Sequence, residues 1–165
     1  MQTARLRLEC WSHIHFGCFA DIARDPDVMR FINGGVPWAD FEIREFIRRQ
    51  MRHRARKGFC MWRIVRRPDG RTLGFCGLQP LNFENRNAVE IGWWLAKQYW
   101  RRGLATESAR LAMKQGFARA RLTRVIAIAM PQNAASRHVM HKLGMRYVRS
   151  AKRRGFDVVV YSVAR

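Results

Sequence analysis

Two hydrophobic periods divide the chain, a period of two that is typical of strands and a period near 3.6 that is typical of helices. Strand patterns occur at seven places, several of them bounded by turn residues such as Pro68-Asp-Gly-Arg71. The predicted strands are 6–11, 59–66, 72–80, 89–95, 124–130, 146–150 and 157–163. Polar residues over 82–87 predict a loop before the fourth strand.

Four segments have helical spacing. The first ends near Asp25-Pro26, because proline disfavours helical backbone in the residue before it. Asp40 is the expected N-cap of the longest helix and Gly144 the expected C-cap of the last. The predicted helices are 14–23, 40–57, 104–119 and 133–143. The order β-α-α-β-β-β-α-β-α-β-β indicates one mixed α/β (α+β) domain over residues 1–165, with helices on both faces of a mixed sheet.

Charge dominates the composition, with 32 basic and 12 acidic side chains and a formal net charge of +20. Most basic residues are arginines, and local clusters occur only over 44–57 and 149–154. Nucleic acid, a ribosome or an acidic substrate would each explain this charge. Arginine-rich codon usage with solvated helix faces is the simpler explanation. The charge therefore predicts salt-dependent binding to polyanions without selecting a function.

The sequence gives little indication of a membrane-spanning segment or of a metal-binding site. No segment approaches the roughly 20 apolar residues that cross a bilayer. The four cysteines form no Cys-x-x-Cys pair and have no ligand spacing to histidine, so we expect a cytoplasmic protein without a metal. His138 and His141 lie at i and i+3 on one predicted helix, but no acidic or cysteine partner stands at ligand spacing, and we expect surface histidines.

The stretch from Glu90 to Glu107 carries the clearest functional signal. An apolar strand over 89–95 leads into a short basic turn, and Gly103 opens the third helix. A strand, a tight turn and a helix N-terminus leave several backbone N–H groups unpaired, which together with the helix dipole favour an anion. The turn lacks the Lys-Ser/Thr pair of a P-loop and the three glycines of a dinucleotide fingerprint. This segment is therefore the candidate anion site.

Six motifs, in order along the chain, resemble the GNAT superfamily of N-acetyltransferases. Within the superfamily, the chain is most similar to the branch that contains the ribosomal-protein N-terminal alanine acetyltransferases. The motifs are Asp25-Pro-Asp-Val-Met-Arg-Phe31, Leu73-Gly-Phe-Cys-Gly-Leu78, Glu90-Ile-Gly-Trp-Trp-Leu95, Arg102-Gly-Leu-Ala-Thr-Glu107, Asn133-Ala-Ala-Ser136 and His141-Lys-Leu-Gly-Met145. The resemblance implies a sheet that splays between its fourth and fifth strands to admit acetyl-CoA.

The resemblance also assigns cofactor-binding residues. It implies that the backbone of Trp93, Trp94 and Leu95 lines the pantetheine arm and that Asn133 touches the same arm. The anion of the basic turn is then the pyrophosphate of coenzyme A, held by backbone N–H groups. The turn residues so assigned are Trp100, Arg101, Arg102, Gly103, Leu104, Ala105 and Thr106.

Two positions depart from the family pattern. The branch commonly has Gly-Lys where this chain has Arg101-Arg102, and losing that glycine makes a positive φ less favourable at residue 101. The added guanidinium offsets this if it pairs with phosphate. Many members place a tyrosine seven residues after the asparagine as proton donor, but here Met140 stands there. In this branch, a serine three residues after the asparagine is the proposed proton donor instead, and Ser136 occupies that position here.

Acetyl transfer to an amine needs a base for the ammonium, donors for the carbonyl oxygen and a proton for the departing thiolate. Glu90 is the candidate base, acting directly or through water, and Ser136 the candidate proton donor. A backbone N–H of the 93–95 strand would serve the oxyanion. Glu90 pairing with Arg86 or Arg124 is the structural alternative.

The acceptor site is expected beside Trp38 and Glu90, with walls from 33–38, 82–87 and 150–156. The expected reaction is direct attack in a ternary complex by a protein N-terminus or a small amine, the enzyme being a monomer or homodimer. The wall segments are basic or neutral, which favours a neutral or acidic acceptor over a polycation. The alternative is a catalytically impaired module of the same fold that binds RNA or a ribosome through its basic surface.

Overall fold

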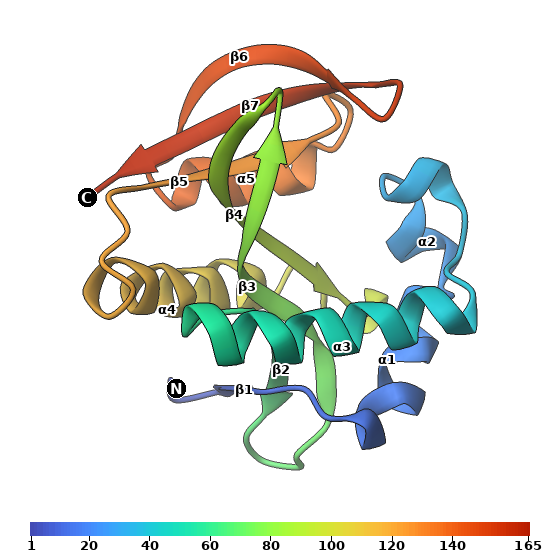
Figure 1. Cartoon of the computed structure of the whole chain (residues 1–165). Helices are drawn as coiled ribbons and strands as arrows, with labels where there is room; N and C mark the ends of the chain where they lie inside the picture. The colour runs from blue at the N-terminus through green and yellow to red at the C-terminus, as the bar shows by residue number, and fades with distance from the viewer.

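The computed structural model describes every residue from Met1 to Arg165 and centres on one seven-stranded sheet (Figure 1). The strands lie in the order β1-β2-β3-β4-β5-β7-β6, and all neighbours are antiparallel except β4 and β5, which are parallel. Their bounds are β1 Leu6–Glu9, β2 Met61–Arg66, β3 Thr72–Phe83, β4 Arg86–Leu95, β5 Arg124–Ala129, β6 Arg146–Arg153 and β7 Phe156–Ala164. The predicted mixed sheet is confirmed.

Helices cover both faces of this sheet, as predicted (Figure 1). Phe46 of α3 packs against Phe75 of β3, with ring centroids 4.9 Å apart. On the other face, a Cβ built on Gly116 of α4 would approach Leu78 of β3 to 2.4 Å. Residues three apart on a strand point to opposite faces, so α3 and α4 lie on opposite sides of β3. The helices are α1 Phe16–Ala23, α2 Pro26–Met29, α3 Asp40–Lys57, α4 Leu104–Ala118 and α5 Ala134–Lys142, with 3₁₀ turns at His13–His15, Asn33–Gly35 and Lys97–Tyr99.

Each face is packed in a different way. Aromatic rings fill the side under α1 and α3, where Phe19, Phe46, Phe75 and Trp94 lie within 4.8 to 6.2 Å of their neighbours. Small residues line the side of α4, and two of its alanines are fully buried. The small-residue stripe brings α4 close to the sheet, which places the N-terminus of that helix directly beyond the end of β4.

Two elements differ from the sequence prediction. Pro26 ends α1 as predicted but also begins α2, because the Asp25 side chain accepts hydrogen bonds from the backbone N–H groups of Asp27 and Val28. The predicted loop over 82–87 is a tight hairpin instead, and Asn82 pairs with Asn87 in register. Glu84 and Asn85 make the turn with φ values of 50° and 59°.

The start of α3 is also shifted by one residue. Ala39 is the N-cap in place of Asp40, and the side chain of Glu42 accepts the Ala39 backbone N–H at 2.8 Å. Gly58 ends α3 in the left-handed conformation, with φ of 75°. None of the helices is long and apolar enough to span a bilayer.

Candidate functional site

The sheet divides where β4 meets β5. The only register pair between these strands is Glu90 with Ile126, whereas β4 pairs with β3 along its whole length and β5 pairs with β7 along its whole length. From Ile91 to Leu95, β4 therefore has a strand partner on one side only. Backbone groups left without a strand partner are available to a ligand. The predicted splay between the fourth and fifth strands is confirmed.

Beyond this opening, the turn from Trp100 to Gly103 presents backbone donors. The backbone N–H groups of residues 101–106 have no acceptor within the protein. Gly103 precedes α4 with φ of 74°, and Arg101 has φ of 59°, the left-handed conformation that disfavours a side chain. The indole N–H of Trp100 donates to the carbonyl of Leu95 at 2.7 Å and ties the turn to the end of β4. Free N–H groups at a helix N-terminus attract an anion.

A second helix N-terminus lies at the same open end. Because β4 and β5 are parallel, α4 and α5 both begin beyond the carboxyl ends of their strands (Figure 1). Asn133 caps α5, its side-chain carbonyl accepting the backbone N–H of Ser136 at 3.0 Å. That bond leaves the amide NH₂ of Asn133 as a free donor. The half-buried Ser136 hydroxyl has no hydrogen-bond partner in the protein and can donate to a ligand.

Glu90 lies where the sheet divides, and 7% of it is exposed. One carboxylate oxygen accepts from Arg153 Nη1 at 2.9 Å and the other from Gln79 Nε2 at 2.8 Å. Neither of the two arginines expected from the sequence is its partner, and Arg124 instead donates to Ser162 at 3.0 Å. The carboxylate is thus buried, ion-paired and adjacent to the opening.

Of the three segments predicted to form the acceptor walls, 33–38 contacts both β4 and 150–156, and 82–87 contacts β6. Trp38 packs edge-to-face on Trp94, with ring centroids 4.8 Å apart. The ring of Phe156 lies against Gly34, where an added Cβ would approach it to 3.0 Å. The β3–β4 turn is joined to β6 by an ion pair between Glu84 and Arg149.

Other candidate groups lie away from this chemistry. His138 and His141 are exposed, and no group of three histidine, cysteine or acidic side chains is arranged to hold a metal ion. Met140 is 1% exposed and packs in the core, and its thioether has no proton to donate. Burial raises the pKa of Cys76 to about 12, which keeps that thiol protonated.

Sequence reasoning missed Gln79 and Arg153 as partners of Glu90. Gln79 could have been found, because a hairpin centred on Glu84-Asn85 places residue 79 directly opposite residue 90. Arg153 carried no signal, since it reaches Glu90 from a strand that follows 63 residues later. Its position depends on the β6–β7 hairpin curving back over β4.

Comparisons with known proteins agree with this geometry. A family model described as "Acetyltransferase (GNAT) domain" matches residues 5–146. The Bacillus subtilis protein YkkB is 31% identical over 96% of this chain and 92% of its own length. The FsC-acetyl coenzyme A-N(2)-transacetylase of Aspergillus fumigatus is 30% identical over 90% of this chain and 65% of its own length.

Solved structures show the same fold. A GNAT-family acetyltransferase from Bacillus anthracis superposes with a TM-score of 0.83 at 25% identity, covering 99% of this chain and 97% of that one. The RimL ribosomal L7/L12 α-N-protein acetyltransferase in complex with coenzyme A superposes with a TM-score of 0.77 at 18% identity, covering 98% of this chain and 95% of that one. At that identity the second match shows the fold alone.

Proposed function

The chain belongs to the GNAT acetyltransferase family and is an acetyl-CoA-dependent N-acetyltransferase, and from this premise we propose that it acetylates a primary amine by direct attack in a ternary complex. The observation that carries the proposal is the opening between β4 and β5, which ends at the free N–H groups of residues 101–106. A narrow opening suits a linear pantetheine arm, and the N-terminus of α4 suits a pyrophosphate.

The backbone and side-chain groups around the opening fit the pantetheine arm and the pyrophosphate of coenzyme A. The unpaired edge of β4 at Trp93, Trp94 and Leu95 would hydrogen-bond the amides of the arm. The turn from Trp100 to Thr106 would hold the pyrophosphate, and the guanidinium of Arg101 would add a charge-assisted bond to it. The free NH₂ of Asn133 would donate to the arm from the other side.

In the proposed reaction, the acceptor arrives as an ammonium ion and loses one proton to Glu90, directly or through a water molecule. The amine nitrogen then attacks the thioester carbon, while a backbone N–H of the Trp93–Leu95 segment stabilises the oxygen. The new C–N bond replaces the C–S bond, the attacking nitrogen releases its second proton to solvent, and the Ser136 hydroxyl protonates the departing thiolate. Solvent then returns the proton to Ser136.

The acceptor is a small amine or a protein N-terminus. Trp38 and Glu90 border the place where the amine must stand, beside Trp94. Similar proteins support both classes, since one relative is an N(2)-transacetylase and RimL, which shares the fold, is a ribosomal L7/L12 α-N-protein acetyltransferase. The excess of basic over acidic side chains favours a neutral or acidic acceptor.

The test is release of the coenzyme A thiol from acetyl-CoA in the presence of amines from both classes, with acetylated product identified by mass spectrometry. Glu90→Gln and Ser136→Ala should each lower kcat by about 100-fold, the usual worth of a positioned acid or base. His138→Ala removes an exposed side chain from the same helix as Ser136 and should leave kcat unchanged. Full activity in both site variants would refute the assigned roles.

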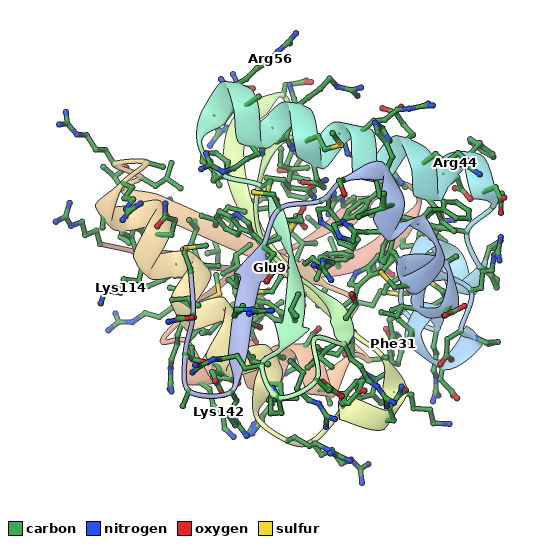
Figure 2. The ribbon with its side chains drawn as sticks, turned by 90° about the horizontal axis from the view of Figure 1, so that it is seen from below. Glu9, Phe31, Arg44, Arg56, Lys114 and Lys142 are labelled. Carbon is green, nitrogen blue, oxygen red and sulfur yellow. The ribbon has the colours of Figure 1, made fainter.

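One observation supports a second candidate function, binding of RNA or a ribosome. Four exposed arginines at i, i+4 spacing run along α3, and Figure 2 shows Arg44 and Arg56 near its two ends. They are Arg44, Arg48, Arg52 and Arg56, of which Arg52 forms an ion pair with Glu45. Like charges at this spacing destabilise a helix, and a polyanion would relieve the repulsion. Salt-insensitive association with ribosomes, or none at low salt, would remove this candidate.

A further inference from the structure

The proposed base is already occupied by two donors. Arg153 Nη1 and Gln79 Nε2 each donate to a different oxygen of Glu90, at 2.9 and 2.8 Å. Gln79 lies directly opposite Glu90 in the β3–β4 register, so the pairing of these two strands fixes its contact with Glu90. Arg153 reaches over from the β6–β7 hairpin, and about 30% of its side chain is exposed. Arg153 is therefore the partner that an incoming acceptor can displace.

An amine without a carboxylate would bind poorly beside the Glu90–Arg153 ion pair. The amine arrives as a cation, and the guanidinium of Arg153 is a fixed cation beside the carboxylate that would receive it. Replacing Arg153 with the ammonium would leave the guanidinium close by without an acid partner. An unpaired charge in a partly buried site is costly.

The geometry points to an acceptor that carries a carboxylate close to its amine and inserts between Glu90 and Arg153. This inference rests on the proposed function and names its substrate class. The acceptor ammonium takes the place of the guanidinium beside Glu90, and the acceptor carboxylate takes the place of Glu90 beside Arg153. Two ion pairs then replace one, and every charge keeps a partner.

Other charges on the hairpin agree with this assignment. Arg149 and Lys152 have acid partners at the surface, Glu84 and Asp157. The acid partner of Arg153 is Glu90 alone. The pKa of Arg49 on α3 is lowered, first by burial and also by the charge of Arg154 in the hairpin turn, while Glu45 acts to raise it. A negative group on the acceptor would be attracted to this side of the site.

The exchange also accounts for product release. In the reaction the ammonium passes one proton to Glu90, and its nitrogen bonds to the acetyl carbon and releases a second proton to solvent. The C–S bond breaks, and Ser136 protonates the sulfur to give the coenzyme A thiol. The product amide is uncharged at nitrogen but keeps its carboxylate. Once Glu90 loses its proton to solvent, it competes with that carboxylate for Arg153, and the resting ion pair expels the product.

The test compares acceptors that differ only in the carboxylate. Alanine is paired with alaninamide, and aspartyl-alaninamide is paired with asparaginyl-alaninamide. The first pair represents a free amino acid and the second an acidic peptide N-terminus. The wild-type protein should show kcat/KM about 10- to 100-fold higher for the carboxylate member of at least one pair, as expected for one charged hydrogen-bonded contact. The pair that shows it identifies the source.

Variants of two neighbouring residues assign the preference. Arg153→Ala should reduce the ratio within the pair to about one, mainly through a higher KM for the carboxylate acceptor, and Arg153→Lys should restore part of it. Lys152→Ala is the matched control, because it removes an exposed cation whose side chain lies on the opposite face of the strand from Arg153 and from the acceptor. It should keep the wild-type ratio. Melting temperatures of all three variants check that each is folded.

Equal kcat/KM within both pairs would overturn the inference, as would a carboxylate preference that survives in Arg153→Ala. If no amine is acetylated, the proposed function fails separately, and calorimetric binding of the same four compounds to the coenzyme A complex decides the inference. Tighter binding of a carboxylate compound that is lost in Arg153→Ala would uphold it. Equal binding or no binding would overturn it.

Discussion

Replacing Arg101 with glycine tests two effects of this one residue, the strain of its left-handed backbone and the contact of its guanidinium with the pyrophosphate. Arg101 has φ of 59°, a conformation that costs a residue with a side chain about 1 to 2 kcal/mol. Glycine removes this strain but adds about 0.4 to 1 kcal/mol of unfolded-state entropy. The net gain is about 1 kcal/mol, which corresponds to a rise in melting temperature of about 2 to 4 °C for a chain of this size.

The same substitution should weaken the binding of acetyl-CoA. If the guanidinium pairs with the pyrophosphate, its loss removes about 1.5 to 3 kcal/mol, or roughly a 10- to 100-fold increase in Kd. The backbone N–H groups of the turn remain, so binding is reduced and not abolished. Calorimetric titration at 50 mM and 300 mM salt measures the change, and the difference from wild type should shrink at the higher salt.

Arg121→Gly provides a matched control. Arg121 is exposed and has φ of 51°, so the variant removes the same charge from the same backbone conformation. It lies beyond the C-terminal end of α4, about 22 Å of helix from the turn. Both variants should gain stability, and only Arg101→Gly should lose affinity. An unchanged or lower Kd in Arg101→Gly would refute a phosphate contact by this guanidinium.

Three further outcomes follow from the packing and the titratable groups. Gly74→Ala should lower the free energy of unfolding by about 3 kcal/mol in urea titrations, because φ is 147° and a Cβ would stand 2.0 Å from a backbone oxygen of β4; a loss below about 1 kcal/mol would contradict this packing. Cys10 is exposed and should react with a thiol reagent at pH 8, whereas Cys76, with its pKa raised to about 12, should react only after denaturation, and mass spectrometry of the labelled peptides distinguishes them. Burial lowers the pKa of His15 and His53 below the usual 6.5, so below that pH the unfolded chain binds more protons and stability falls; the urea midpoint should drop between pH 7 and pH 5, and a His15→Gln/His53→Gln variant should flatten that drop.

Elements with strong periodicity were predicted well from the sequence. The strand over 124–130 and the helix over 104–119 agree with β5 and α4 to within one residue, because each is a long run with one clear period. The small residues of this helix let it lie close to the sheet, where Ala109 and Ala112 are fully buried. Local patterns determine such elements, and the resemblance to a known family supplied their arrangement.

The site was harder to predict, because its contacts join distant segments. The turn before α4 was identified as an anion site from its own residues, and its free N–H groups agree with that. The partner of Glu90 was not identified, since Arg153 reaches it through the curvature of the β6–β7 hairpin. The hairpin turn at Glu84-Asn85 has the sequence pattern of a loop, because its strand ends are polar and carry no alternating hydrophobic signal.

The central claim is that the opening between β4 and β5, with the turn before α4, binds acetyl-CoA. Calorimetric titration of the purified protein with acetyl-CoA at moderate salt, with ATP as the anion control, tests it most directly. The account predicts saturable micromolar binding of acetyl-CoA that ATP does not reproduce, because only acetyl-CoA has an arm to fill the opening. No binding, or equal binding of ATP, would contradict it and would reduce the turn to a nonspecific anion site.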